Sequence, residues 1–290
     1  MINIISRDNG SGLSKDIQIV KNNIKHPSRI VPFDQHIMPS KADINIFIEL
    51  FDPRFLSTAK KNYIIPNQEW YYDAWRKYIP SFDLILCKTK LAEQRFSMAG
   101  GKCMFTSFTS FDHYLPIIKK KNILHTSNNS KTKGTKKIIE IYNRFPDLPE
   151  VTIVSRKIKG YAPGINKIEK FIPDQQFKIL QNKHQIHLCP SVSEGFGHYI
   201  VEAMSAKCIV ITTDGSPMNE IVTNDTGFLI PIDTSIPFRM GDNHYWNEVD
   251  LINTLFEAVR STELKEKGEA AREWYLKNDQ FFKKQIQEIL

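Results

Sequence analysis

The sequence predicts an α/β protein built from two parallel-sheet halves. Short apolar strands alternate with amphipathic helices along its 290 residues, which indicates βαβ units. The strands lack the strict alternation of polar and apolar residues that marks a sheet with one exposed face. The length also favours two domains, because a single hydrophobic core rarely grows beyond about 250–300 residues.

In the first half, each predicted strand is a short apolar run. Such runs occupy residues 2–6, 44–50, 63–65, 84–87 and 102–107. Amphipathic helices are expected over residues 14–25 and, after the fourth strand, up to about residue 96.

The pattern restarts after a connector at residues 113–122, which holds Pro116 and a run of three lysines. Strands are expected at 123–126, 151–155, 186–189 and 209–212, and helices at 135–145, at 173–183 and from residue 198 onward. The last stretch, residues 263–290, predicts one long charged helix with aromatic anchors.

Composition excludes several classes of protein. Apolar residues make up 41% and charged residues 24% of the chain, as in ordinary globular proteins and unlike disordered, collagen-like or disulfide-stapled chains. No apolar run approaches the ~18 residues of a membrane span, so membrane contact is expected to be peripheral at most. Residues 1–5 lack the basic and apolar regions of a secretory signal.

Cysteine usage indicates a reducing compartment. Cys87, Cys103, Cys189 and Cys208 lie in apolar contexts without CxxC spacing. This predicts free thiols, a cytoplasmic location and no metal site.

The chain is basic, with 39 Lys and Arg against 32 Asp and Glu and a net charge of +7. Such a surface favours an anionic partner: a nucleotide, a phospholipid surface or a nucleic acid. Charge alone does not choose among the three.

The most informative stretch is the loop "PSVSEGFG" at residues 190–197, between an apolar strand and a helix that begins near His198. Ligands of parallel sheets bind at the carboxyl ends of strands, where such loops lead into helices. Gly195 and Gly197 permit close backbone approach, and a helix N-terminus favours phosphate. The same argument marks the loops at 7–13, 127–134 and 213–217.

This string, with "EAM" and the strand "CIVITT" after it, resembles the donor-binding signature of retaining glycosyltransferases of the two-domain GT-B fold. The resemblance is closest to family 4, or group 1. "TTDGSPMNEIV" and "NDTGFLIP" match the continuation of the family pattern. The similarity is close over residues 122–235 and extends to the first half only as an order of elements.

The resemblance implies roles for the residues of this loop and of the following helix. Glu194 would contact hydroxyls of the donor sugar, and Glu202 the ribose of the nucleotide, since ionised carboxylates accept hydrogen bonds from diols. The backbone of Gly195, Phe196 and Gly197 would bind the sugar or the diphosphate. Glu194 is expected to orient the sugar rather than to act as a covalent nucleophile.

A second loop, "TSNNSKTKGT", supplies the predicted cation. Lys133 matches the family lysine that stabilises the leaving nucleoside diphosphate without a metal, so Lys133 and Glu194 are the predicted catalytic residues. The family arginine is replaced by Asn128, and Lys131 and Arg156 are the two candidates to take over its charge.

Two further departures concern the donor half. The glycine that usually ends the "EAM" helix is Lys207, which would cost ~1 kcal/mol in a left-handed conformation. Gly215 and Ser216, with Pro217 at the expected first helical position, replace the commoner Gly-Gly turn.

The acceptor side is harder to read. The turn after the first strand is either a plain strand–helix connection or a loop that reaches the donor phosphates. The polar cluster that follows the third strand is either a solvated helix start or part of the acceptor site. His113 fits a domain boundary better than a base. The candidates on this side are Gly10, Ser11, Gly12, Asn67, Gln68 and Glu69.

The resemblance implies two Rossmann-like domains, at residues 1–113 for the acceptor and 114–275 for the donor, facing across a cleft. A helix at 276–290 would return to the first domain. The expected activity is retaining, metal-independent and cofactor-free transfer of a hexose from a UDP- or GDP-sugar. The acceptor would be a hydroxyl of a glycan or of a lipid-linked saccharide, and the enzyme would be cytoplasmic, with peripheral contact to an anionic membrane left open.

Alternatives come from other classes. An epimerase of the same fold would use the same motif, and a phosphorylase would need a pyridoxal lysine for which there is no signal. A basic, non-enzymatic binder of nucleic acid or anionic glycan would use the lysines at 119–121 and 131–137. These runs lack the interleaved aromatic residues expected for nucleic acid, so no nucleic-acid partner is expected.

Overall fold

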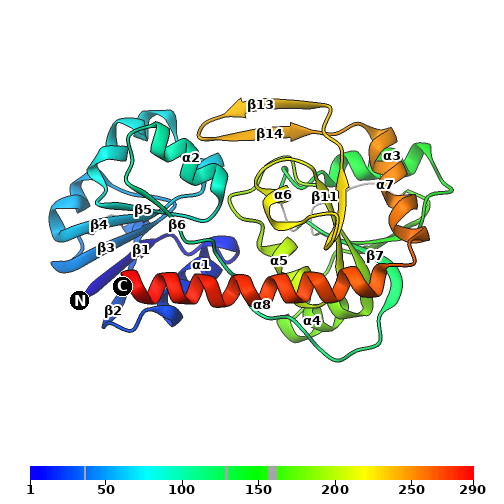
Figure 1. Cartoon of the computed structure of the whole chain (residues 1–290), viewed down its shortest axis with the longest axis horizontal. Coiled ribbons are helices and arrows are strands. Elements are labelled where there is room, and N and C mark those ends of the chain that lie inside the picture. Colours follow the sequence, from blue (N-terminus) through cyan, green and yellow to red (C-terminus); the bar gives the residue numbers. More distant parts are fainter. Residues whose placement is uncertain (36, 128–129, 156–161) are drawn as a thin grey trace. The chain divides into compact units, whose positions relative to one another are not determined.

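The computed structural model describes residues 1–35, 37–127, 130–155 and 162–290, and their contacts divide into two compact units. The first unit comprises residues 1–110, 237–242 and 277–290, and the second comprises 111–236 and 243–276. Within the described residues, each unit contains a six-stranded sheet flanked by helices (Figure 1). The paired strands run parallel, which confirms the predicted α/β class.

The sheet of the first unit has the strand order β2-β1-β3-β4-β5-β6. Its elements are β1 (Ile2–Ser6), α1 (Gly12–Asn23), β2 (Ser28–Pro32), β3 (Ala42–Ile48), β4 (Ala59–Ile65), β5 (Leu84–Cys87), α2 (Lys90–Met98) and β6 (Cys103–Phe105). Short 3-10 turns cover Phe33–Gln35, Pro53–Thr58, Gln68–Trp70 and Asp73–Ser81.

Several expectations for this unit need correction. The strand expected at 63–65 begins at residue 59, and the helix expected at 14–25 covers residues 12–23. The strand expected at 44–50 begins and ends two residues earlier, and the one expected at 102–107 is only three residues long. β2 was not predicted. It is an edge strand in which no residue is fully buried. It therefore lacks the apolar run by which the other strands were predicted.

The sheet of the second unit has the order β12-β11-β10-β7-β8-β9. Its elements begin with β7 (Lys120–Thr126), α3 (Thr135–Arg144), β8 (Val151–Val154), β9 (Ile165–Ile168), α4 (Asp174–Lys183) and β10 (His184–Cys189). They continue with α5 (His198–Ser205), β11 (Ile209–Thr213), α6 (Met218–Ile221), β12 (Gly227–Ile230), α7 (Glu248–Arg260) and α8 (Leu264–Ile289). β13 (Thr234–Phe238) and β14 (Gly241–Tyr245) form a separate two-stranded sheet.

Here β9, α7 and the two-stranded sheet were not predicted, and β7 begins three residues before the expected strand. Residues 120–122 are exposed lysines and an asparagine, so only the buried end of β7 carries an apolar signal. The last fourteen residues of the chain belong to the first unit, and so does the segment 237–242, which no sequence pattern indicated.

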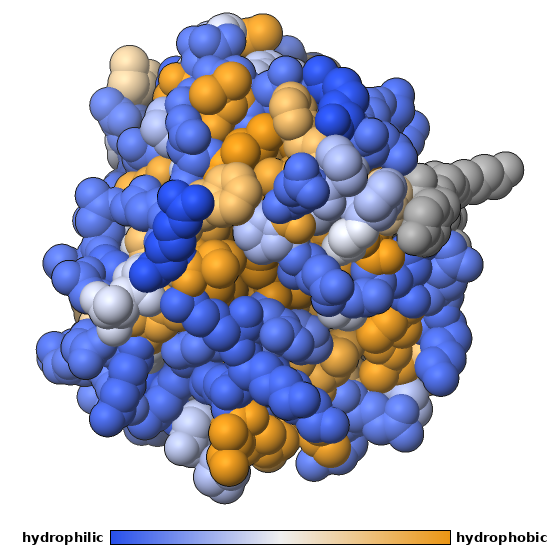
Figure 2. Space-filling view, turned by 90° about the vertical axis from the view of Figure 1, so that its right-hand side faces the viewer, coloured by the Kyte–Doolittle hydropathy of each residue, from blue (hydrophilic) through white to orange (hydrophobic). Residues whose placement is uncertain are grey.

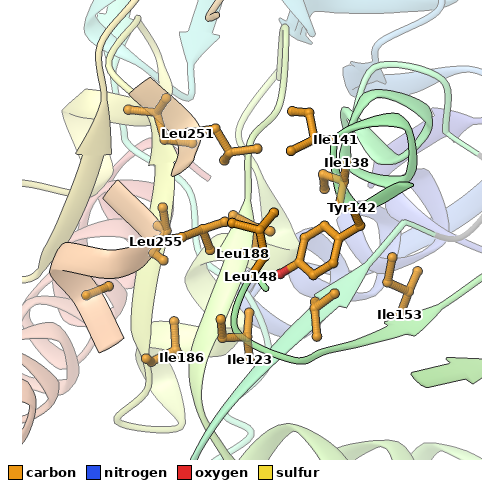
Figure 3. Close-up of a cluster of buried hydrophobic side chains, with 14 of the residues drawn as sticks. Ile123, Ile138, Ile141, Tyr142, Leu148, Ile153, Ile186, Leu188, Leu251 and Leu255 are labelled. Carbon is orange, nitrogen blue, oxygen red and sulfur yellow. The ribbon is translucent and has the colours of Figure 1, made fainter. Parts of the chain in front are cut away.

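The core of the second unit lies between its sheet and the helices α3 and α7. Tyr142 of α3 and Leu251 and Leu255 of α7 converge on Ile186 and Leu188 of β10 (Figure 3). This packing fixes β10 between its neighbours and so sets the position of the loop that follows it.

The surface is mainly hydrophilic on the side that carries α3 and α7, with apolar areas between the polar side chains (Figure 2). Across the described ranges, the structure contains no helix with both the length and the apolar character of a membrane span.

Candidate functional site

Three of the loops marked by the sequence meet at one edge of the second sheet. They follow β7, β10 and β11, which are adjacent in the order β11-β10-β7. Because these strands are parallel, their carboxyl ends lie at the same edge, where ligands of α/β sheets bind. We call residues 130–134, 190–197 and 213–217 the site loops. The backbone N–H of Val192 donates to the carbonyl of Thr132 over 2.7 Å, which ties two of them together.

The loop at 190–197 ends on a glycine that the helix start requires. Gly197 has a φ of 99° and caps α5, in a left-handed conformation that disfavours other residues. Gly195 and Phe196 are buried beside it. Glu194 is half-buried, and its carboxylate accepts a hydrogen bond of 2.6 Å from the hydroxyl of Ser191.

Lys133 lies in the neighbouring loop, directly before the glycine that caps α3. Gly134 has a φ of 71°, and a Cβ there would lie 2.8 Å from the carbonyl oxygen of Pro190, so only glycine fits. Lys133 Nζ lies 3.2 Å from the centroid of the Tyr199 ring. This contact places a cation against the first turn of α5.

The structure thereby brings the two predicted catalytic residues into one contact chain. Lys133 stacks on Tyr199, the Tyr199 and Ser191 hydroxyls are 2.5 Å apart, and Ser191 bonds Glu194. Burial raises the pKa of Tyr199 well above its usual value, so the phenol stays neutral and can donate. Sequence reasoning missed Tyr199 and Ser191, although Ser191 lies in the quoted loop and Tyr199 two residues after it.

Glu202 belongs to a different group of side chains. It is 2% exposed in the second turn of α5, and its carboxylate lies 4.0 Å from Nδ1 of His113. That nitrogen also lies 2.6 Å from the side-chain oxygen of Gln181. The structure therefore places Glu202 with His113 and Gln181, and Glu194 with Lys133.

The third site loop forms a tight turn with a cis peptide bond between Ser216 and Pro217. Gly215 packs directly beneath the ring of His244. Pro217 was expected at the first helical position, but it caps the short helix α6, which begins one residue later at Met218.

Of the other residues predicted near the diphosphate in or beside this loop, the structure describes Lys131. Lys131 is exposed, in the same loop as Lys133. Asn128 and Arg156 lie outside the described residues.

In the first unit, the glycine turn after β1 is closed by its own polar groups. Asp8 accepts a hydrogen bond from the N–H of Gly10, and Asn9 accepts one from the N–H of Ser11, which caps α1. Gly10 is exposed with a φ of 63°, and Gly12 is the first residue of the helix. Both interpretations of this turn remain predictions.

Asn67 joins a buried polar cluster at the carboxyl edge of the first sheet. Its side-chain oxygen accepts a hydrogen bond of 2.9 Å from Lys88, and its side-chain nitrogen donates to Glu49 over 2.5 Å. Lys88 forms a 2.6 Å ion pair with Asp16, and both side chains are at most 2% exposed. Glu49 has a φ of 66°, which is strained for a residue other than glycine.

Burial raises the pKa of Glu49 above its usual value, against the opposing effects of the Asn67 hydrogen bond and the Lys88 charge. Sequence reasoning missed Glu49, Lys88 and Asp16. Glu49 and Lys88 each directly follow an apolar strand, and this placement was the available signal.

Gln68 and Glu69 face another segment of the first unit. The Gln68 carbonyl accepts a hydrogen bond from the N–H of Met240, and the Glu69 carbonyl accepts one from the guanidinium of Arg239. These two candidates therefore anchor residues 237–242 through their backbone.

Among the residues with described positions, no group of three or more His, Cys, Asp or Glu side chains is placed to hold a metal ion.

Comparisons with known proteins agree with this architecture. Residues 166–236 match the family described as glycosyl transferases group 1. No curated protein matches the chain. The HepE protein of Anabaena, solved in complex with UDP and glucose, is similar with a TM-score of 0.70 and 13% identity, over 98% of this chain and 97% of that chain.

A glycosyltransferase from Rickettsia africae is similar with a TM-score of 0.68 and 15% identity, over 99% of this chain and 97% of its own. The GtfA/B complex matches with a TM-score of 0.63 and 15% identity over 86% of this chain, which spans only 58% of the GtfA/B chain. TarM likewise is spanned over 56% of its length, at 17% identity. Residues 166–236 thus carry the pattern of the group 1 glycosyltransferases, and the two sheets share the fold of these solved glycosyltransferases.

Proposed function

We propose that the chain transfers a hexose from a nucleoside-diphosphate sugar to a hydroxyl group, with retention of configuration and without a metal. The observation that carries the proposal is the contact chain from Lys133 through Tyr199 and Ser191 to Glu194 at the start of α5. It combines a fixed cation, a carboxylate and a helix N-terminus in one place.

Each part has a task in cleaving a glycosyl phosphate. As the bond between the anomeric carbon and the phosphate oxygen breaks, its electron pair moves to the diphosphate. Lys133 and the N–H groups at the start of α5 stabilise that growing charge. Because these donors are held by packing before the reaction, little reorganisation is needed.

Glu194 is suited to orient the sugar rather than to attack it. Its carboxylate already accepts from Ser191 and retains acceptor capacity for hydroxyl groups of the donor. The acceptor hydroxyl would form the new bond, and its proton would pass to the departing phosphate oxygen.

Glu202 is proposed to bind the ribose. Its near-complete burial beside His113 gives it a fixed orientation, which suits a bidentate contact to a cis-diol. Lys131 and Arg156 are the candidates for a second cation that contacts the diphosphate. Lys131 lies in the same loop as Lys133, and Arg156 lies outside the described residues.

UDP-glucose is the first donor to test, because the similar Anabaena protein was solved with UDP and glucose and with UDP-glucose. We further propose that the acceptor is a glycan or a lipid-linked saccharide that contacts the first unit through Asn67 or the turn at Gly10–Gly12. The location would be cytoplasmic, with the basic surface permitting contact to an anionic membrane.

The test measures release of UDP from UDP-glucose, with and without EDTA, and binding of UDP by calorimetry. Lys133→Met keeps the stem but removes the charge and should lower turnover by about 10²-fold, as for loss of one charge-stabilising donor. Glu194→Gln should have a comparable effect. Turnover should not change with EDTA.

Lys136→Met is the matched control. Its ammonium group is solvent-exposed in the first turn of α3, the helix that follows Lys133, and pairs only weakly with Glu140, at 3.6 Å. Full activity in Lys133→Met would refute the assignment of the site. If neither UDP nor GDP binds the wild-type protein, the chain is better described as a basic, non-enzymatic binder of nucleic acid or anionic glycan. Formation of an epimeric nucleotide sugar as product would instead indicate an epimerase.

A further inference from the structure

His244 in β14 and Trp246 just after it contact the loop at 190–197 and Gly134 of the loop at 130–134. The N–H of His244 donates to the carbonyl of Val192 over 2.8 Å, and the indole N–H of Trp246 donates to the carbonyl of Pro190 over 3.2 Å. A Cβ on Gly134 would lie 3.1 Å from the Trp246 ring. These two residues lie beyond the segment matched by the family, which ends at residue 236.

The ring of His244 reaches the remaining loop. Nε2 lies 2.8 Å from the carbonyl oxygen of Ser216, and Nδ1 lies 2.7 Å from the hydroxyl of Ser235. A carbonyl oxygen can only accept, so Nε2 carries a proton and donates to Ser216, and Nδ1 shares a hydrogen bond with the Ser235 hydroxyl. The side chain is 5% exposed, so water is a poor substitute for either bond.

The face of the same ring packs on Gly215. A Cβ at that position would lie 2.4 Å from Cγ of His244, closer than any real contact. Gly215 and His244 therefore fit each other, and the turn at 213–217 is held both by a hydrogen bond and by ring packing. This explains the glycine without a contact between its backbone and a ligand.

We propose that His244 is a positioning residue of the donor site. Through its backbone it holds the loop at 190–197, and through its ring it holds the turn at 213–217, so that the two loops keep one relative geometry. His244 does not touch the donor in this scheme. The inference rests on the proposed function, because it assigns both loops to the donor sugar.

Preordering of the turn has an energetic consequence. A ligand that binds a fixed turn does not have to order it, so affinity is gained without a further contact. If the ring is lost, the Ser216 carbonyl lacks its donor and the turn gains alternative conformations. The sugar moiety should then bind less well, whereas UDP alone depends less on this turn.

Two variants separate the hydrogen bonds from the packing. His244→Phe keeps a ring over Gly215 but removes both hydrogen bonds. His244→Gln retains an N–H donor that can reach the Ser216 carbonyl. His184→Phe is the matched control, because the His184 ring also contacts one carbonyl, that of Leu180 at 2.8 Å, and one hydroxyl, that of Thr152 at 3.2 Å, without touching a site loop.

Titration with UDP-glucose and with UDP measures the effect. His244→Phe should weaken UDP-glucose binding by about five- to tenfold and UDP binding by less, as expected for one lost buried hydrogen bond. His244→Gln should restore most of the loss. His184→Phe should lower the melting temperature without changing the ratio of the two affinities.

Amide hydrogen exchange of the free protein tests the same proposal without a ligand. His244→Phe should accelerate exchange at residues 213–219 by about tenfold, and His184→Phe should not. Unchanged exchange there, or equal losses for UDP and UDP-glucose in both His244 variants, would overturn the positioning role. Failure of the wild-type protein to bind any nucleotide would refute the proposed function instead, and the exchange data would still decide whether His244 orders the turn.

Discussion

At the scale of single residues, burial sets the protonation state of His125 beneath the site. Its ring is fully buried at the end of β7, between the carbonyl of Leu188 at 2.7 Å and the hydroxyl of Thr135 at 2.8 Å. Desolvation lowers the pKa of His125 to about 4, and the charge of Lys133 acts in the same direction. The ring is therefore neutral near pH 7 and contacts Thr135, the first residue of α3, two positions after Lys133.

This shift predicts a loss of stability in mild acid. In the unfolded chain the ring binds a proton near its ordinary pKa of 6.5, whereas the folded protein binds it only near 4. Stability should thus fall as the pH drops from 6.5 toward 4, by about 3 kcal/mol from this group alone. In His125→Asn the unfolding free energy, measured in urea at several pH values, should be lower at pH 7 and should fall less steeply. An unchanged slope would contradict the assignment.

Lys88 and Asp16 show a different consequence of burial at the residue scale. Removing two charges from water costs several kcal/mol, and close pairing only offsets that cost. The ion pair between Lys88 and Asp16 is therefore expected to contribute little to the free energy of unfolding. Its hydrogen bond to Asn67 links it to the strained Glu49, and strain of this kind is common at functional sites.

At the scale of elements, Lys207 follows the end of α5 at a position where the family pattern has glycine. Lys207 has a φ of 57°, which confirms the expected left-handed conformation. The N–H of Lys207 bonds the carbonyl of Met204, and the N–H of Cys208 bonds that of Ala203, as in a Schellman motif. The Lys207 ammonium group contacts Glu269 at 2.7 Å and so partly offsets the strain.

Lys207→Gly should therefore stabilise the protein by less than the full ~1 kcal/mol of left-handed strain. The lost ion pair is partly exposed and contributes at most about 0.5 kcal/mol. We expect the melting temperature to rise by about 2 °C. Lys207→Ala is the control: it keeps the strain and loses the ion pair, so its melting temperature should fall.

A ladder of asparagines fixes the register of the first sheet. Asn3, Asn45 and Asn62 lie opposite one another on β1, β3 and β4, and their side chains bond in sequence over 2.8 and 3.0 Å. A shift by one residue would leave these buried amides without partners. Asn62 and the exposed Lys60 and Lys61 before it lack an apolar signal, which is why only residues 63–65 of β4 were predicted.

At the scale of the whole molecule, the first unit is assembled from distant parts of the chain. Phe282 and Phe281 of α8 pack on Phe108 and Phe105, with ring centroids 4.9 and 5.8 Å apart. Asn278 also bonds the carbonyl of Phe108 over 2.6 Å. The first unit thus depends on residues 277–290 for part of its core.

Removal of residues 277–290 should destabilise the first unit selectively. Phe282 is fully buried, and loss of a buried phenylalanine side chain costs about 3–5 kcal/mol. Calorimetry should show one transition shifted downward and the other near its original temperature. Phe282→Ala should reproduce the shift, whereas Lys284→Ala, at an exposed position of the same helix, should not. Equal shifts of both transitions would contradict the division into units.

The sequence determined the class of the fold and the identity of the site loops. Buried parallel strands need continuous apolar runs, and tight turns before helices need glycine, so both leave local patterns that can be read without coordinates. Lys133 and Glu194 were predicted because the motifs that contain them resemble the glycosyltransferase pattern.

The tertiary structure decided which side chains meet. The contacts of Tyr199, Ser191 and His244 are created by packing, and the motif around Ser191 and Tyr199 does not indicate which of its side chains meet. The same holds for Glu49, Lys88 and Asp16, which converge from two strand ends and a helix. Proximity created by packing has no local signature, because it depends on how strands are ordered in the sheet rather than on the residues beside them.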